Sequence, residues 1–255
     1  GASRALEMLG RVVHGYEVAP TSTPPQGLGG FGTPILRLDL NQVETHELFD
    51  VAHLVCAFSG RYFTRFGGAG RGEERQWGTY LGEHYQLLRY IASELPEGAR
   101  VVDIGTRHGA SALALASSGH QVDTWNLDWE EFDLNAKHCG LTREEMLDEA
   151  EHVHFHVGDV LVDAPAMLLD ADLIMLDTDH DGKFEAEAYR FLQTYNFSGL
   201  VILDDIYLNR EMDRFWASVK EPKVDLTDVG HSSGTGLVMF GSAHAVITPL
   251  DDEAG

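Results

Sequence analysis

The sequence contains little cysteine and no long apolar run. Cys56 and Cys139 are the only cysteines among 255 residues, so we expect two reduced, structural thiols and no disulfide framework. No apolar stretch approaches the roughly 20 residues that a membrane-spanning helix needs, and no secretory signal is visible. These absences argue against a disulfide-rich secreted protein and predict a cytoplasmic one without a membrane partner.

Positive charge is also scarce. Lysine and arginine together number 18, against 41 aspartate and glutamate residues, which gives a formal net charge of −23 at pH 7. Such a surface repels the phosphate backbone of nucleic acids and anionic membranes, so we expect neither as a partner. A salt-rich cytoplasm and solubility alone would each account for this composition.

The remaining composition suits one α/β domain with an added N-terminal segment. A hydrophobic fraction of 44% is enough for a sizeable core. Residues 1–78 are expected to form an arm, a helix and a substrate-facing loop: 20–34 are rich in proline and glycine, 35–40 are strand-like, 41–58 have helical spacing, and 59–78 carry aromatic residues. Those aromatic residues either pack the loop against the rest of the protein or line a substrate pocket. Residues 79–245 form the main domain, and residues 246–255 a tail.

Strand-like and helix-like segments alternate through the main domain. After a helix at 80–95, strands are expected at 100–104, 121–127, 152–157, 172–176 and 200–203, with helices at 109–118, 130–139, from 142, from 165, at 183–194 and at 209–219. Such repeated units predict a mostly parallel sheet that is covered on both faces. The segments 223–229 and 236–240 predict a final hairpin with an antiparallel strand. The expected fold is therefore α/β, a Rossmann-like, doubly wound sheet of seven strands.

A glycine turn follows the first of these strands. Asp103, Gly105 and Gly109 form a D-x-G-x-x-x-G pattern. Glycine lets the backbone approach a ligand closely, and the start of the next helix offers unpaired N–H groups. The candidate cofactor-binding residues here are Asp103, Gly105, Thr106, Gly109 and Ser111. Arg107 occupies the place of the second glycine of the G-x-G-x-x-G dinucleotide fingerprint, and a strand-to-helix turn without a ligand is the structural alternative.

Acidic residues follow each of the expected parallel strands. Ligands of open α/β sheets bind beyond these strand ends, and so many like charges at one edge need hydrogen bonds or a counter-charge. Three acids, Asp103, Asp128 and Asp159, suit a nucleoside. Asp128 is spaced from the glycine turn like an acid that binds a ribose, and Asp159 is placed to accept from an adenine amino group. Trp129 is a candidate to stack on the adenine. Packing is the alternative for Trp129, and turn or cap roles are the alternatives for Asp103 and Asp159.

The other three acids suit a metal. Asp177, Asp204 and Asp205 offer hard oxygen donors from neighbouring strand ends, which favours Mg²⁺ or a similar cation over zinc or copper. The alternative is that Asp205 caps the next helix and Asp204 is a buried, hydrogen-bonded carboxyl. His180 lies three residues beyond Asp177, flanked by acids, which favours a general base. His231, on the hairpin turn, is the next histidine to consider.

The order of these parts resembles the class I S-adenosylmethionine (SAM)-dependent methyltransferases over roughly residues 80–240. The second half is similar to the Mg²⁺-dependent small-molecule O-methyltransferases of the catechol and macrolide-sugar types. The resemblance implies SAM as cofactor, with Asp177 close to it, and a metal held by Asp177, Asp204 and Asp205. It also implies His180 as the base, as in the macrolide-sugar type, whereas the catechol type uses lysine. Arg107 departs from the commonest G-x-G-x-G turn of this group.

The activity implied is methyl transfer to a hydroxyl of a small molecule. A sugar diol, polyol or phenol of the natural-product kind has two adjacent oxygens that can chelate the metal while the base removes a proton. A methyltransferase without metal, a nicotinamide dehydrogenase and a non-catalytic SAM-binding protein are the alternatives. The glycine pattern and the terminal hairpin weigh against the dehydrogenase. The oligomeric state stays open, a homo-oligomer included.

Overall fold

A computed structural model describes residues 35–45 and 84–250, apart from 108, 140–141, 151 and 231–232. All of these residues belong to the unit Thr33–Gly255. The predicted arm at 1–34, most of the predicted helix at 41–58, the loop at 59–78 and His231 lie outside the described residues. Within the described part of the chain, no helix has the length and apolar character that crossing a membrane requires.

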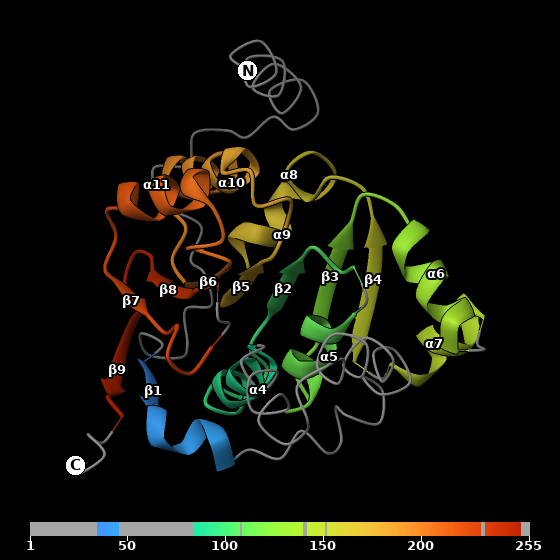
Figure 1. The fold of residues 1–255 in the computed structure, drawn as a ribbon, viewed down its shortest axis with the longest axis horizontal. Helices are drawn as coiled ribbons and strands as arrows, with labels where there is room; N and C mark the ends of the chain where they lie inside the picture. Colours follow the sequence, from blue (N-terminus) through green and yellow to red (C-terminus); the bar gives the residue numbers. More distant parts are fainter. Residues whose placement is uncertain are drawn as a thin grey trace, which may run out of the picture. The chain divides into compact units, whose positions relative to one another are not determined.

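A seven-stranded sheet with the order β4-β3-β2-β5-β6-β8-β7 forms the centre of the unit (Figure 1). Its parallel strands are β2 (Val101–Ile104), β3 (Val122–Asn126), β4 (Val153–Val157), β5 (Leu173–Leu176) and β6 (Leu200–Asp204). β8 (Thr235–Met239) runs antiparallel to both β6 and β7 (Lys223–Asp225). The chain starts in the middle of the sheet and winds outward in both directions, so the Rossmann-like, doubly wound fold predicted from the sequence is confirmed.

Helices cover both faces of this sheet (Figure 1). They are α4 (Tyr85–Ser93), α5 (Ala110–Ala116), α6 (Glu130–Cys139), α7 (Arg143–Glu149), α8 (Val160–Asp163), α9 (Pro165–Leu169), α10 (Lys183–Thr194) and α11 (Arg210–Ser218). The helix predicted from 142 begins with a capping box between Thr142 and Glu145, at the start of α7. The short helix α8 was not predicted.

Two hydrophobic clusters lie on opposite faces of the sheet. Neighbouring strand residues alternate between them because successive side chains of a strand point to opposite faces. Leu173 packs with the buried residues of α4 and α5, whereas Ile174 packs with those of α9, α10 and α11. β2, β5 and β6 are buried along their whole length, as expected for parallel strands with helices on both sides.

A second, two-stranded parallel sheet joins β1 (Ile35–Asp39) to β9 (His244–Thr248). The strand-like character of 35–40 was predicted, whereas β9, part of which falls in the predicted tail, was not. The 3-10 helix η1 (Leu40–Thr45) follows β1. The side chains of Leu36 and Leu38 are buried in the α4 cluster, and the Asp39 N–H donates to the Tyr90 hydroxyl of α4 at 2.9 Å. This small sheet therefore packs beside the helix that precedes β2.

Candidate active site

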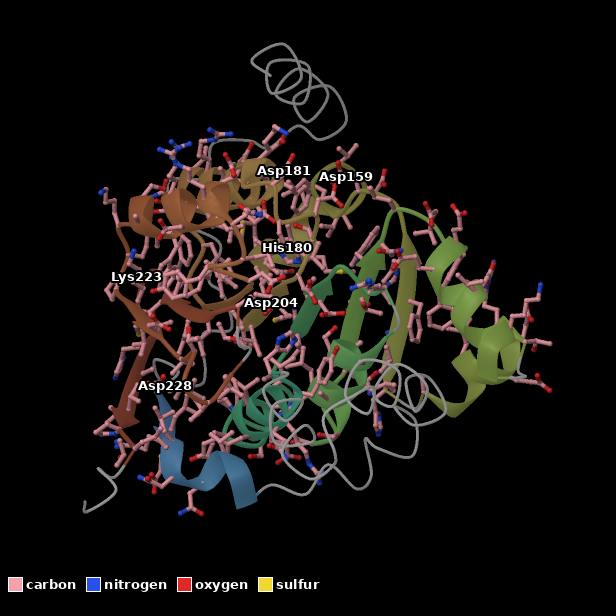
Figure 2. All side chains as sticks on the ribbon, in the orientation of Figure 1. Asp159, His180, Asp181, Asp204, Lys223 and Asp228 are labelled. Carbon is pink, nitrogen blue, oxygen red and sulfur yellow. The ribbon has the colours of Figure 1, made fainter. Side chains whose placement is uncertain are left out.

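His180 lies between carboxylates from two loops at the carboxyl ends of β5 and β6. Its Nε2 is 3.1 Å from Asp177 Oδ1 and 3.3 Å from Asp205 Oδ2. Figure 2 shows His180 close to Asp204, the last residue of β6. His180 and Asp205 both have left-handed backbones, with φ values of 53° and 57°. Such values are uncommon outside glycine and are often found at functional sites.

Side-chain hydrogen bonds from Glu185 and Asn209 fix the loop that carries His180. The buried Glu185 of α10 accepts hydrogen bonds from the His180 N–H at 3.1 Å and from the Thr178 hydroxyl at 2.8 Å. The Asn209 amide donates to the His180 carbonyl, in the next peptide group, at 2.8 Å. The Asn209 Oδ1 also caps α11. Two elements therefore fix the backbone of His180, and neither contact was predicted from the sequence.

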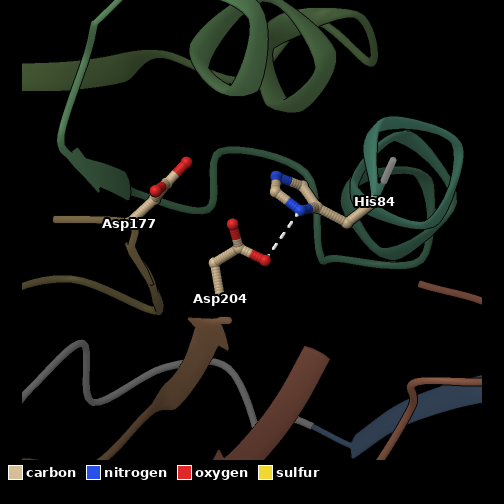
Figure 3. A group of neighbouring side chains, drawn as sticks. All are labelled: His84, Asp177 and Asp204. Atoms are coloured by element: carbon tan, nitrogen blue, oxygen red, sulfur yellow. Dashed lines mark ion pairs between the residues drawn. The ribbon is translucent and has the colours of Figure 1, made fainter. Parts of the chain in front are cut away.

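A second group of side chains lies on the other side of Asp204. His84, directly before α4, is 1% exposed, and its Nδ1 is 3.0 Å from Asp204 Oδ1. Figure 3 shows the imidazole and the carboxylates of Asp177 and Asp204 converging on one another. His84 was not among the predicted site residues, because no local pattern relates the start of α4 to the end of β6.

These side chains form two overlapping groups with metal-ligand geometry. One comprises His84, Asp177 and Asp204, and the other comprises His180, Asp204 and Asp205; within each group the ligand atoms lie within 4.8 Å of one another. The three predicted ligands are thus divided between two groups that share Asp204. Burial, and then the charge of Asp204, raises the pKa of Asp177. A divalent cation would relieve this crowding of carboxylates, so the donor set fits a metal.

The protonation of His180 reflects opposing influences. Burial lowers its pKa, but the hydrogen bond to Asp177 and the charges of Asp177, Asp205 and Asp204 outweigh burial and raise the pKa above its usual value. A cation held by the same carboxylates would lower the pKa of His180. The Ser233 hydroxyl donates to Asp205 Oδ1, so the Gly-Ser-rich turn before β8 also reaches this site.

The glycine turn lies directly beside this carboxylate group. Gly105 has a φ of 103°, and a Cβ added to it would lie 1.5 Å from the Asp177 carbonyl oxygen. Gly109, with a φ of 85°, is the N-cap of α5. Only residues without a Cβ allow this approach of the β2 turn to the end of β5. Arg107 has a φ of 42° and pairs with Glu131 of α6 at 2.9 Å.

The predicted polar residues of the turn are buried. Asp103 is 0% exposed and accepts a hydrogen bond from the Thr124 hydroxyl at 2.6 Å. The Thr106 hydroxyl is 2.6 Å from that of Thr124, and Ser111 is 4% exposed. Burial raises the pKa of Asp103 to about 6. The side chains of Asp103, Thr106 and Ser111 therefore support the turn, as the structural alternative expected for Asp103, and their contact with a cofactor stays a prediction.

The nucleoside candidates lie at the ends of β3 and β4. Asp128 is exposed, and its Oδ1 accepts from the Glu130 N–H at 2.8 Å. Asp159 caps α8 through the Leu161 N–H at 3.0 Å, which matches the cap alternative; Figure 2 shows it beside α8. Trp129 packs edge-on against Phe132, with the Arg143 guanidinium 4.6 Å above its ring. This matches the packing alternative for Trp129, whereas adenine stacking stays a prediction.

Two exposed apolar side chains at this end of the sheet were not among the residues predicted from the sequence. Leu127, directly after β3, is 69% exposed, and Val157, the last residue of β4, is 44% exposed. The two strands pair Asn126 with Val157, so the apolar side chains lie at one edge with Asp128 and Asp159. The sequence does show a leucine beside an acid at the end of a strand, and this pattern could have indicated the exposed apolar surface.

The comparisons with known proteins give structural likenesses only. No protein-family model matches the chain, and no curated protein matches it. Among solved structures it is similar to the SAH-bound methyltransferase PaMTH1 of Podospora anserina, with a TM-score of 0.48, 16% identity, and coverage of 74% of this chain and 87% of that one. It is also similar to a methyltransferase from Geobacter sulfurreducens, with a TM-score of 0.44, 18% identity, and coverage of 74% and 90%. Cofactor-bound Rv0187 from MTB has a TM-score of 0.44 and 19% identity, with coverage of 78% and 93%. These values are too low to transfer a function, which rests on the side chains of the site.

Proposed function

We propose that the protein is a SAM-dependent O-methyltransferase that uses a divalent metal and acts on a hydroxyl of a small molecule. The observation that carries this proposal is the convergence of His180, Asp177 and Asp205 beside Asp204 at the carboxyl ends of β5 and β6. If His180 is the base, it lies next to carboxylates that could bind a metal, on the side of the sheet where ligands of such folds bind.

We assign the binding site of the methyl donor, SAM, to the carboxyl ends of β2, β3 and β4. The exposed Asp128 is available to a ribose, and Leu127 and Val157 offer apolar surface to an adenine ring. The Gly105–Gly109 turn brings backbone N–H groups of α5 toward the same edge. A SAM molecule that spans this edge from β4 to β2 would extend toward Asp177 and the metal ligands.

In the proposed reaction, Nε2 of His180 takes the proton of the substrate hydroxyl while the hydroxyl oxygen attacks the methyl carbon of SAM. The C–O bond forms as the C–S bond breaks, which leaves a methyl ether, S-adenosylhomocysteine and a protonated His180. Asp177, Asp204 and Asp205 would hold the metal, which when bound lowers the pKa of the hydroxyl and fixes its position. Glu185 and Asn209 orient the base through its peptide groups.

The substrate class follows from the same chemistry. A molecule with two adjacent oxygens can occupy neighbouring positions on one cation, so a sugar diol, another polyol or a phenol fits best. The exposed side chains of Tyr207 and Leu208 follow Asp205 after the buried Ile206, and they would lie beside such a substrate.

A nicotinamide dehydrogenase is the less favoured function. Dinucleotide-binding sheets of the doubly wound type have the strand order 3-2-1-4-5-6, whereas here the antiparallel β8 lies between β6 and β7. Nicotinamide binding also gives no role to the carboxylates around His180. A metal-independent methyltransferase would share the nucleoside end of the site and differ only at Asp177, Asp204 and Asp205.

The nucleoside half of the proposal is tested by calorimetry with S-adenosylhomocysteine and with NAD. The wild-type protein should bind the former and not the latter. Asp128→Ala should weaken binding by about 10- to 100-fold, because a charge-assisted hydrogen bond contributes about 1.5–3 kcal/mol. Asp170→Ala, at an exposed position outside the site, is the matched control. Equal affinity in wild type and Asp128→Ala would remove Asp128 from the site.

The reaction itself is tested by transfer of a labelled methyl group from SAM to a panel of catechols and sugar diols. Transfer should stop when the metal is chelated and return when a divalent cation is restored. Undiminished transfer after exhaustive chelation would make the metal assignment wrong and favour the metal-independent alternative. No transfer to any panel member, despite tight binding of S-adenosylhomocysteine, would favour a non-catalytic SAM-binding protein.

A further inference from the structure

The position of His84 is fixed by the core. The residue lies at the N-terminus of α4, where its carbonyl accepts the first helical bond from the Leu88 N–H at 2.8 Å. Leu87, Leu88 and Ile91 of the same helix are fully buried in the cluster on that face of the sheet. The imidazole itself is 1% exposed and meets the Tyr85 ring edge-on at 5.0 Å. A packed helix therefore presents one imidazole to the carboxylate site.

The surroundings of this imidazole are rich in negative charge. Asp204 Oδ1 lies 3.0 Å from His84 Nδ1, and Asp177 completes the group within 4.8 Å (Figure 3). Asp103, with no exposed surface, also acts electrostatically on this group. Even a protonated His84 would leave more negative than positive charge among these residues. Buried carboxylates in such an excess require a cation or protons.

We propose that His84 supplies a nitrogen ligand to the metal, together with Asp177 and Asp204, so that the site prefers a first-row transition ion such as Mn²⁺, Fe²⁺ or Co²⁺ over Mg²⁺. This inference rests on the proposed metal-dependent function and changes the identity of the metal. Mg²⁺ binds oxygen donors and retains its water, whereas imidazole suits transition ions. The prediction of Mg²⁺ from the sequence rested on oxygen donors alone, because His84 is far from the three aspartates along the chain.

The assignment of the nitrogen ligand is tested by pulsed EPR of the Mn²⁺-loaded protein. The wild-type spectrum should show coupling to an imidazole nitrogen, and labelling the histidines with ¹⁵N should change it. His180→Gln should retain this coupling, since His180 belongs to the other group of ligands. Loss of the coupling in His180→Gln would assign the nitrogen to His180 and overturn the proposal. This arm does not require a folded His84 variant.

The preference for the ion is tested by calorimetry of the metal-free protein with Mn²⁺ and with Mg²⁺. His84→Gln replaces the nitrogen donor by an amide oxygen, and it should lower Mn²⁺ affinity at least about 10-fold while changing Mg²⁺ affinity less. His120→Gln is the matched control, because His120 is another buried histidine and bonds to Ala92 at the far end of α4. Equal Mn²⁺ affinity in wild type and a folded His84→Gln would contradict the inference.

Failure of this inference is separable from failure of the proposed function. Metal affinity that does not depend on His84, together with binding of S-adenosylhomocysteine, would reject only the nitrogen ligand. Histidine-dependent Mn²⁺ binding in a protein that binds no S-adenosylhomocysteine would retain the metal site and reject the methyltransferase. A wild-type protein that binds no divalent cation would overturn the nitrogen ligand while leaving the nucleoside site to its own titration.

Discussion

Two side chains of the site sit in environments that change their acid–base behaviour, and their pKa values move upward for different reasons. For Asp103 the main cause is complete burial. For His180 burial acts in the opposite direction, and the surrounding aspartates outweigh it. The raised pKa of Asp103 has consequences for stability, whereas the raised pKa of His180 has consequences for catalysis.

His180→Ala should lower kcat of methyl transfer by about 10²–10⁴-fold, the range typical of a positioned base. Affinity for S-adenosylhomocysteine should stay nearly unchanged, because His180 lies at the metal end of the site. The acidic limb of the pH–rate profile should also disappear. His154→Ala removes an exposed histidine that pairs with Asp123 outside the site, and it should leave kcat unchanged. Near-wild-type turnover in His180→Ala would mean that proton loss does not pass through this side chain.

Asp103 should make the stability of the protein fall between about pH 4 and pH 6. Its folded-state pKa of about 6 exceeds the ordinary value of 3.8 for an aspartate, so the folded state binds the proton more tightly than the unfolded state. Its contribution is therefore greatest below the lower pKa and decreases as the pH rises through the higher one. A difference of roughly two units corresponds to about 3 kcal/mol.

Urea unfolding of wild type and Asp103→Asn in metal-free buffer measures this effect. The wild-type protein should lose stability relative to Asp103→Asn as the pH rises from about 4 to about 7. Asp170→Asn, at an exposed site, controls for the loss of a charge. A pH-independent difference between wild type and Asp103→Asn would show that Asp103 does not retain its proton in this range.

At the scale of elements, two close contacts between loops define the site. The β2–α5 turn approaches the end of β5 at Gly105, and the β5–α10 loop is tied to α10 by Glu185 and to the start of α11 by Asn209. The contacts at Gly105 and Asn209 join segments that follow neighbouring parallel strands. The proposed metal ligands therefore depend on backbone positions that their own side chains do not determine.

Gly105→Ala should destabilise the protein and disturb Asp177. The new Cβ would lie 1.5 Å from the Asp177 carbonyl oxygen, so the backbone of one loop must move. Gly119→Ala is a matched control, because Gly119 also has a positive φ, +82°, but has no atom within 4 Å of the added Cβ. Gly119→Ala reports the backbone strain alone, commonly about 1 kcal/mol.

Chemical denaturation and metal calorimetry of both variants check this prediction. Gly105→Ala should lose more stability than Gly119→Ala and should also lose metal affinity, which Gly119→Ala should retain. Similar losses in the two variants would show that left-handed backbone strain, and not the contact with Asp177, explains the role of Gly105.

At the scale of the whole molecule, the net charge of −23 acts against folding. Like charges repel most strongly in the compact state. Raising the ionic strength from 0.01 M to 0.15 M shortens the screening length from about 30 Å to about 8 Å. The unfolding midpoint should therefore rise over this range, equally in NaCl and KCl, as measured by thermal denaturation of the metal-free protein. A falling or unchanged midpoint would mean that local ion pairs outweigh the overall repulsion.

The sequence by itself determined the elements and their order. Hydrophobic runs of strand length, helical spacing and the capping box at Thr142 are local signals, and they placed the strands and helices of the seven-stranded sheet within a few residues. The same logic brought Asp177, Asp204 and Asp205 to one edge, because parallel strands must end on the same side. The seven strands and the antiparallel hairpin followed from the pattern of connections.

Only the tertiary structure decided which side chains meet across that edge. His84 reaches Asp204, Arg143 covers Trp129, and β9 pairs with β1 through contacts between segments that are distant in sequence. Such contacts depend on how helices pack on the sheet, and no local propensity encodes them. The contact of Asp103 with a cofactor stays a prediction, and the structure adds that Asp103 is buried, because helices cover both faces of β2. The local pattern thus predicted which strand ends carry the candidate site, and packing determined which side chains meet there.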